Sequence, residues 1–384
     1  MPVERTLPTP EARALLELTR ELADGELRTR VTEFERRAEF PREVFGTLGK
    51  AGLLGLPYPE EHGGGGQPYE VYLQVIEELA GAWLAVGLGV SVHSLACYPT
   101  AAFGTGEQRD RLLPGLLGGD LLGAYCLSEP QSGSDAVAMT TRAVRHGDDY
   151  VLDGVKAWVT HGGQADFYTV FARTSADTRG ISCFHTAADT AGLRPQRPEK
   201  KMGMASSPTA QVVLDGARVP ADLRIGAEGE GYRIALSALD GGRLGIAACG
   251  VGVAQAALDY AVGYARERRQ FGRPIVEFQG LSFLLADMAT QVGAARALYL
   301  DAARRRDAGM TFRQQAAMAK LFCTDTAMRV TTDAVQVLGG YGYVEDHPVE
   351  RWMREAKVLQ IVEGTNQVQR LVIGRGLAGT QGGG

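Results

Sequence analysis

Three long helical patterns dominate the C-terminal part of the sequence, and they limit the possible folds more than any other feature. Apolar residues recur at three- and four-residue intervals over residues 232–269, 278–309 and 312–340. Each pattern lasts more than 20 residues and ends in glycine or in charged residues. Helices this long bury their apolar faces best against one another. We therefore expect an antiparallel helical bundle over residues 229–384.

The first third of the chain also predicts helices. One amphipathic pattern covers residues 9–55, and a second, more apolar one covers residues 69–117. Between them the stretch PYPEEHGGGGQPY is rich in proline and glycine, which interrupt helices. We expect a helical domain over residues 1–120.

The middle of the chain has a different pattern. Short alternating or β-branched runs such as GAYCLSEP, FYTVFART and AQVVLDGARVP are separated by Asp-Gly and Gly-Gly pairs, which are typical of hairpin turns. A small β domain is expected over residues 121–228. The predicted fold class is therefore α+β, with a helical domain, a β domain and a helical bundle in that order.

Composition and charge exclude several classes of protein. The formal net charge of −5 argues against a general binder of nucleic acid or of an anionic membrane surface. The five cysteines are widely spaced and form no Cys-x-x-Cys pair, so we expect neither a disulfide framework nor a metal site. The N-terminus carries charges throughout, and no 18 apolar residues run together without charge. We expect a cytoplasmic protein without a membrane segment.

Two segments of the predicted β domain could bind a flat polar ligand. In YCLSEPQSGSD, residues 125–135, a strand ends in a loop of serines and glycines that offers hydroxyl groups and close backbone approach. In KAWVTHGG, residues 156–163, Trp158 could stack on an aromatic ring system beside Thr160. An ordinary β-turn and a core tryptophan are the alternatives.

A basic and aromatic cluster follows the first long helical pattern. In ERRQFGRPIVEFQ, Arg268, Arg269 and Arg273 surround Phe271, which suits a pyrophosphate and an adenine. A solvated helix end has the same composition, so this alternative stays open.

A glycine pair interrupts the helical pattern in QVLGGYGY, residues 336–343. Gly339 and Gly340 let a backbone approach a ligand closely. They could equally form the C-cap of a helix.

Glu363 places a carboxylate in an apolar run, directly after Ile361 and Val362. In an apolar site its pKa rises, which makes the carboxylate a better proton acceptor once it is ionised. The alternative is a paired carboxylate in the first turn of a helix capped by Thr365 or Asn366.

Taken together and in the order in which they occur, these segments make the chain resemble the acyl-CoA dehydrogenase family from about residue 10 to residue 376. The resemblance rests on YCLSEPQSGSD, KAWVTHGG, LDGGRLGIAA, YARERRQFGRPIVEFQ, QVLGGYGY and IVEGTNQ. It implies an N-terminal helical domain, a small middle β-barrel and a C-terminal four-helix bundle. LDGGRLGIAA is most similar to the short- and branched-chain members.

The resemblance also implies FAD as the cofactor and assigns residues to it. Those for the isoalloxazine and ribityl part are Tyr125, Leu127, Ser128, Gly133, Ser134, Trp158, Val159, Thr160, Thr365 and Gln367. Those for the pyrophosphate and adenosine are Arg268, Gln270, Phe271 and Gln279, joined by Gln336, Val337, Gly339 and Gly340 of a neighbouring subunit. A homo-oligomer, expected to be a tetramer, follows.

For the substrate, the resemblance implies an acyl thioester of CoA or of an acyl carrier protein. Ser134, Asp240, Arg243 and Gly364 would lie by the thioester, and Glu363 would be the catalytic base. A hydroxyl of the flavin ribityl chain and the backbone N–H of Glu363 would polarise the carbonyl. The β-hydrogen would leave as hydride to flavin N5, giving a trans-2-enoyl thioester and passing electrons to an electron-transfer flavoprotein.

A few relatives carry the glutamate instead on the helix that begins LDGGRLG, where this chain has Gly242. Two positions depart from the family pattern: Val362 stands where many members have tyrosine, and Ala205 where arginine is common.

Other classes of protein remain as alternatives. A flavin oxidase or monooxygenase could share the fold, but the monooxygenases typically lack the glutamate, so Glu363 together with Arg243 argues against them. A non-catalytic helical scaffold or carrier-protein partner would need no flavin.

Overall fold

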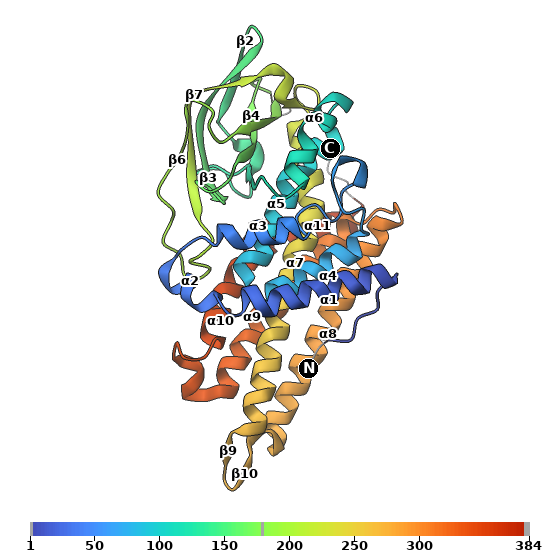
Figure 1. Cartoon of the computed structure of the whole chain (residues 1–384), viewed down its shortest axis with the longest axis vertical. Coiled ribbons are helices and arrows are strands. Elements are labelled where there is room, and N and C mark those ends of the chain that lie inside the picture. Colours follow the sequence, from blue (N-terminus) through green and yellow to red (C-terminus); the bar gives the residue numbers. More distant parts are fainter. Residues whose placement is uncertain (1–2, 178–179, 380–384) are drawn as a thin grey trace.

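The computed structural model describes residues 3–177 and 180–379 and has helical, β and helical parts in that order (Figure 1). The first part is formed by α1 (Pro10–Leu22), a π-helical turn (Ala23–Leu27), α2 (Val31–Arg37), α3 (Arg42–Lys50), α4 (Tyr69–Ala82), α5 (Leu84–Phe103) and α6 (Gly106–Leu117).

The helical pattern of residues 9–55 is divided into separate helices, unlike the continuous one that the sequence suggested. Ala38 ends α2 in the left-handed conformation, with φ of 52°. Pro41 then precedes α3, and the residue before a proline avoids the helical conformation. Apolar periodicity continues through these breaks because α1, α2 and α3 cover the same core.

Within the described residues, α5 and α7 (Gly231–Glu267) are long and apolar enough to cross a membrane by length and composition. The most apolar windows of the two helices are 89% and 72% buried inside the protein. They pack as core helices, where apolar residues on every side are expected. The sequence showed no unbroken apolar run of 18 residues because polar residues interrupt both helices, whereas the mean hydropathy of an 18-residue window averages over these interruptions.

The β part is one mixed sheet with the strand order β6-β7-β3-β2-β4-β5-β8, and β1 pairs in parallel with β4. Its strands are β1 (Gly123–Cys126), β2 (Arg142–His146), β3 (Asp149–Thr160), β4 (Phe167–Arg173), β5 (Ile181–Ala187), β6 (Leu193–Pro195), β7 (Thr209–Pro220) and β8 (Arg224–Ile225). The register between β3 and β7 shifts between Lys156 and Val159. Such a bulge re-aims the side chains beside it.

The last part is a bundle of long helices with a hairpin at one end. It contains α7, the short strands β9 (Arg269–Gln270) and β10 (Arg273–Pro274), α8 (Gln279–Asp307), α9 (Arg313–Leu338), α10 (Val349–Leu359) and α11 (Asn366–Leu377). Because α7 has 37 residues, it is about 55 Å long and runs from the β part to the hairpin (Figure 1). We propose to divide the chain into domains at residues 1–120, 121–228 and 229–384.

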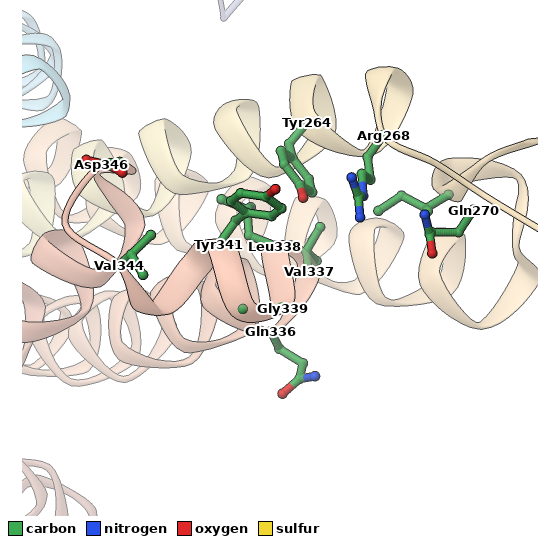
Figure 2. Close-up of a pocket in the computed structure, with 12 residues that line it drawn as sticks. Tyr264, Arg268, Gln270, Gln336, Val337, Leu338, Gly339, Tyr341, Val344 and Asp346 are labelled. Carbon is green, nitrogen blue, oxygen red and sulfur yellow. The ribbon is translucent and has the colours of Figure 1, made fainter.

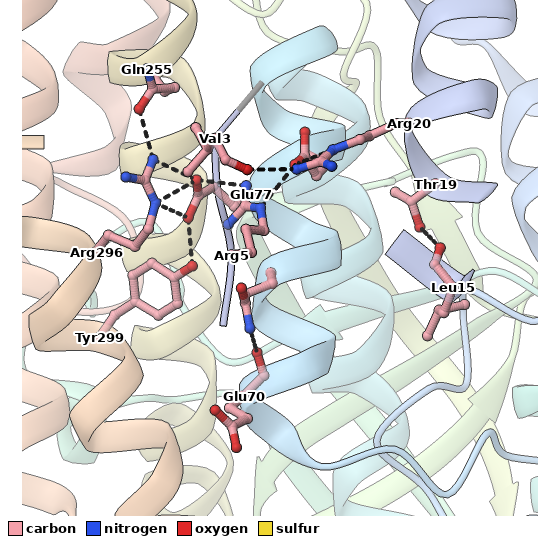
Figure 3. A network of polar contacts seen from close by, with 12 residues as sticks. Val3, Arg5, Leu15, Thr19, Arg20, Glu70, Glu77, Gln255, Arg296 and Tyr299 are labelled. Atoms are coloured by element: carbon pink, nitrogen blue, oxygen red, sulfur yellow. Dashed lines mark hydrogen bonds and ion pairs between the residues drawn. The ribbon is translucent and has the colours of Figure 1, made fainter. Parts of the chain in front are cut away.

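A buried ionic network joins the N-terminal segment to the bundle (Figure 3). Glu77 of α4 accepts hydrogen bonds from Arg5 at 2.8 Å, Arg296 at 2.9 Å and Tyr299 at 2.5 Å. Burial disfavours the ionised form of Glu77, but Arg5 and Arg296 outweigh it and lower its pKa to about 2. The network ties residues before α1 to α4 and α8.

Candidate active site

Glu363 stands in a turn between α10 and α11, and its backbone is left-handed, with φ of 52°. Gly364 follows with φ of 88°, and Thr365 caps α11 by accepting a hydrogen bond from the N–H of Val368 at 3.2 Å. A non-glycine residue pays about 1–2 kcal/mol for this conformation. Glu363 therefore precedes α11. This excludes the alternative of a paired carboxylate in the first turn of that helix.

The carboxylate of Glu363 points into the protein. Both oxygens are buried, and neither has a hydrogen-bond partner within residues 3–177 and 180–379. Burial raises its pKa to about 7, although the positive charges of Lys320 and Arg243 oppose the rise. At neutral pH the group can therefore exchange a proton in either direction.

Gly242 of α7 lies against this carboxylate. A Cβ built on Gly242 would collide with Oε2 of Glu363 and would come within 3.2 Å of Leu95. The space of a side chain at residue 242 is therefore taken by the carboxylate of residue 363.

Arg243, one residue further along α7, is also buried. Its guanidinium bonds to Asp240 at 2.5 Å, and Arg313 lies 3.9 Å from the same carboxylate. Burial raises the pKa of Asp240 and lowers that of Arg243, while the pairing opposes both shifts. The opposite charges of Asp240 and Arg243 therefore nearly cancel on the part of α7 near Glu363.

A small cavity of about 10 Å³ adjoins Gly242. Hydroxyl-bearing and apolar side chains and one arginine line it: Tyr58, Tyr69, Ser91, Ser94, Leu95, Tyr98, Ala238, Gly241 and Arg306. The hydroxyl of Tyr69 donates to the carbonyl of Gly241 at 2.9 Å, and Arg306 lies 3.5 Å above the Tyr69 ring.

The β part brings the two predicted binding segments together. The N–H of Ala157 donates to the carbonyl of Ser128 at 2.9 Å, and this bond joins the loop after β1 to the bulge of β3. Beneath them, Lys156 and Glu129 form a buried ion pair at 2.8 Å. Leu127 is held by the same lysine, which donates to its carbonyl at 3.2 Å.

Trp158 is 65% exposed, so it is not a core tryptophan. Its φ of 60° is left-handed, and it sits at the bulge, which turns its side chain outward. Val159 beside it is buried and can offer a ligand only its backbone, while Thr160 is partly exposed. Gly133 and Ser134 are exposed in the loop after β1.

Tyr125 of β1 links this surface to Glu363. Its hydroxyl donates to the carbonyl of Ala235 on α7 at 3.4 Å. Burial raises the pKa of Tyr125 well above its usual value, and the negative charge of Glu363 adds to this. The Glu363 carboxylate and the β surface therefore lie in one region. Gln367, at the start of α11, is exposed.

Arg268 of the basic cluster meets the glycine pair at the opposite end of α7, whereas Arg269 and Arg273 do not line the pocket found there. This pocket of about 680 Å³ has Tyr264, Arg268, Gln270, Gln336, Val337, Gly339 and Gly340 among its residues (Figure 2). Arg268 lies 5.6 Å above the ring of Tyr341. The described residues that line the pocket do not include Phe271, which is 94% exposed at the hairpin, or Gln279, which begins α8.

The two regions do not meet within one chain. Arg268 and Gly242 lie about 40 Å apart along α7. A ligand shorter than about 40 Å therefore cannot contact both regions of one chain.

Lys320 of α9 is a site residue that sequence reasoning missed. It is buried and donates to the carbonyl of Gly364 at 2.8 Å and to Oδ1 of Asn366 at 2.9 Å. Burial lowers its pKa to about 7, against the opposing effect of Glu363 and Asp325. A lone lysine in the apolar run AAMAKLFC was the available signal.

A buried carboxylate without a hydrogen-bond partner among the described residues thus lies near a surface that displays a tryptophan, on a fold of helical, β and helical parts. Three family descriptions match: "Acyl-CoA dehydrogenase, N-terminal domain" over residues 9–120, "middle domain" over 124–217 and "C-terminal domain" over 229–378.

An "Acyl-CoA dehydrogenase" of Bacillus subtilis (strain 168) is 44% identical over 374 residues, which cover 97% of this chain and 99% of the relative. The structure of butyryl-CoA dehydrogenase from Megasphaera elsdenii is 40% identical with a TM-score of 0.95, covering 98% of this chain and 100% of that one. A chain in a structure described as "Electron transferring flavoprotein of Acidaminococcus fermentans: Towards a mechanism of flavin-based electron bifurcation" is 42% identical with a TM-score of 0.95, covering 98% and 99%.

The chain belongs to the acyl-CoA dehydrogenase family. The predicted resemblance and fold class are confirmed. Members of this family are FAD-dependent oxidoreductases that act on the CH–CH bond of an acyl thioester, and so is this protein.

Proposed function

We propose that this chain oxidises a short-chain acyl-CoA to the trans-2-enoyl-CoA, with Glu363 as the base that removes the proton next to the thioester carbonyl. The observation that carries the proposal is the buried carboxylate of Glu363, which lacks a hydrogen-bond partner among the residues that the structure describes. Buried polar groups in native proteins are normally satisfied, and an exception calls for a functional reason.

The pKa of Glu363 supports this role. The proton α to a thioester carbonyl is weakly acidic, and a general base works best with a pKa near the working pH. Burial brings the pKa of Glu363 to about 7. We assign polarisation of the carbonyl to the backbone N–H of Glu363 and the surroundings of the thioester to Ser134, Asp240, Arg243 and Gly364.

The exposed surface of the β domain suits the isoalloxazine and ribityl part of FAD. Trp158 offers an aromatic face because its side chain is 65% exposed, and Ser128 of the adjoining loop and Thr160 of the same strand offer hydroxyl groups. Thr365 and Gln367 are assigned to the same end. FAD held there would supply the hydride acceptor for the β-hydrogen of the substrate. Trp158 and the loop after β1 would orient the flavin ring and exclude water from it.

The pyrophosphate and adenosine of FAD are assigned to the pocket of Arg268, Gln270 and the glycine pair. Arginine suits a pyrophosphate because its guanidinium donates two parallel hydrogen bonds. Since this pocket lies about 40 Å from Gly242 along α7, an FAD beside Glu363 would have to use the Arg268 pocket of a neighbouring subunit. The proposed assembly is a homotetramer.

The substrate and the electron acceptor follow from smaller observations. The similarity to butyryl-CoA dehydrogenase from Megasphaera elsdenii supports a short acyl group. The similar chain in the Acidaminococcus fermentans structure supports an electron-transfer flavoprotein as the acceptor. We place the reaction in the cytoplasm.

Anaerobic titration of the purified protein with acyl-CoAs from butyryl to palmitoyl tests the proposal, with the absorbance of oxidised flavin as the readout. Butyryl-CoA is expected to bleach the flavin and palmitoyl-CoA is not. A yellow protein that no acyl-CoA bleaches would point to a thioester on an acyl carrier protein or to an oxygen-dependent reaction. A colourless protein that cannot be reloaded with FAD would contradict the proposal.

A further inference from the structure

A buried cation holds the turn that carries Glu363. Lys320 comes from the middle of α9, and its ammonium group contacts the carbonyl of Gly364 and Oδ1 of Asn366 at 2.8 and 2.9 Å. Both acceptors are uncharged. Burying an ammonium group is costly unless its charge acts on something nearby.

The turn itself needs support, because Glu363 and Gly364 are consecutive left-handed residues. Gln369 also donates to the carbonyl of Gly364 at 2.8 Å and lies 3.4 Å from that of Glu363. A Cβ on Gly364 would come within 2.6 Å of the Gln369 amide nitrogen, so the backbone and this side chain are tightly packed. Lys320 of α9 and Gln369 of α11 thus both bind the turn at the carbonyl of Gly364.

Asn366 connects these contacts around the turn to other residues of α9. Its Nδ2 donates to Thr324 at 2.9 Å and to Asp325 at 2.7 Å, while its Oδ1 accepts from Lys320. The amide is therefore oriented by its partners, with its oxygen toward the lysine.

Several charged and titratable groups face Glu363 and Lys320 from the neighbouring elements. They are Asp240, Arg243 and Cys249 of α7, Asp325 of α9, Tyr69 of α4 and Tyr125 of β1. Arg243 is paired with Asp240 at 2.5 Å, and Asp325 accepts from Arg370 at 3.1 Å. Lys320 forms no ion pair among the contacts of the described residues, and its positive charge acts on both Glu363 and Asp325.

We propose that Lys320 is a positioning residue for the reaction: it fixes the left-handed turn that presents Glu363 and supplies the positive charge that favours the ionised base. This inference rests on the proposed function of Glu363. The direction of both pKa shifts agrees with it, since Lys320 opposes the rise at Glu363 and Glu363 opposes the fall at Lys320.

The test compares Lys320→Met, which removes the charge and both donors, with Lys320→Gln, which keeps a donor without the charge. Infrared difference titration of the flavin-loaded protein measures the pKa of the Glu363 carboxyl, with Glu363→Gln identifying its band. We expect this pKa to rise by about one unit or more in both variants, since a nearby opposite charge shifts a pKa by that amount. The acidic limb of kcat/KM against pH moves with it.

Thr331→Val is the matched control. Thr331 is buried on α9 and bonds only to backbone carbonyls of its own helix among the contacts of the described chain. Thr331→Val should leave the pKa of the Glu363 carboxyl unchanged. If Lys320→Gln also leaves the Glu363 titration unchanged, the proposal is overturned, and if Lys320→Met fails to fold, the glutamine variant alone decides.

A second readout separates this inference from the proposed function. Exchange of the α-hydrogens of acetyl-CoA in deuterated water reports on the base without any hydride transfer, and it should slow in both Lys320 variants at pH 6. If the wild-type protein exchanges no hydrogen and no acyl-CoA bleaches its flavin, the proposed function fails. The carboxyl titration still decides whether Lys320 acts on Glu363.

Discussion

The carboxylate of Glu363 occupies the space that a side chain at Gly242 would need. The two residues come from α7 and from the turn before α11, far apart in the sequence, yet only one of them can carry a side chain at this point. A side chain at residue 242 would enter this space from α7, on the other side from Glu363.

Gly242→Ala therefore tests the geometry of the base. The added methyl group displaces the Glu363 carboxylate, and a base displaced by about 1 Å loses on the order of 100-fold in rate. We expect kcat to fall by this factor while FAD stays bound. Gly263→Ala on the same helix is the control, because no described atom lies within 4 Å of a Cβ built there. Equal activity of the two variants would contradict the placement.

The pKa of Glu363 also predicts how stability depends on pH. Its pKa is raised by burial from 4.5 to about 7 in the folded state, so the contribution of Glu363 to stability is present below pH 4.5 and is lost as pH rises through 7. Glu363→Gln cannot ionise. We expect this variant to have a higher Tm than the wild-type protein at pH 8, with the difference shrinking toward pH 5. Thermal unfolding of the FAD-free proteins across this range measures it, and a constant difference would argue against a buried, protonatable carboxyl.

Trp158→Ala separates cofactor binding from folding. Because Trp158 is 65% exposed, its loss should leave the Tm of the FAD-free protein almost unchanged and raise the Kd for FAD. The fully buried Trp83 gives the contrast: Trp83→Ala should lower the free energy of unfolding by about 3–5 kcal/mol. Calorimetry and flavin fluorescence titration distinguish the two effects. Unchanged FAD affinity in Trp158→Ala would contradict the stacking role.

Arg268→Ala should release FAD and loosen the oligomer, because the pocket that it lines lies far from the base of its own chain. Arg266→Ala, on an exposed residue of the same last turn of α7, is the control. Flavin absorbance and sedimentation velocity report the two outcomes. A flavin-loaded and intact Arg268→Ala oligomer would count against the pyrophosphate role.

The sequence predicted the order of the domains because helical and strand periodicities differ clearly along it. It could not decide whether Trp158 is core or displayed, since that depends on the bulge where β3 and β7 shift register. Nor could it find Lys320, because its partners, Gly364 and Asn366, meet it only through the packing of α9 against α11. The meeting of Arg268 with Gly339 was likewise a matter of tertiary structure, although both had been singled out as ligand contacts.

Helix ends were the least predictable feature. Residues 9–55 keep an apolar period through Ala38 and Pro41, since the separate helices cover one core. Apolar periodicity reflects which side chains are buried. Here the burial of side chains continues across the turn between α2 and α3, so the pattern does not mark the helix ends.

The most direct test of the central claim is rapid anaerobic mixing of flavin-loaded wild-type protein and Glu363→Gln with butyryl-CoA, with the absorbance of oxidised flavin followed in time. Loss of a positioned general base costs about 100- to 10,000-fold in rate. We predict that the wild-type flavin bleaches rapidly, while the variant binds butyryl-CoA and stays yellow on the same timescale. Bleaching of the variant at the wild-type rate would show that Glu363 is not the base.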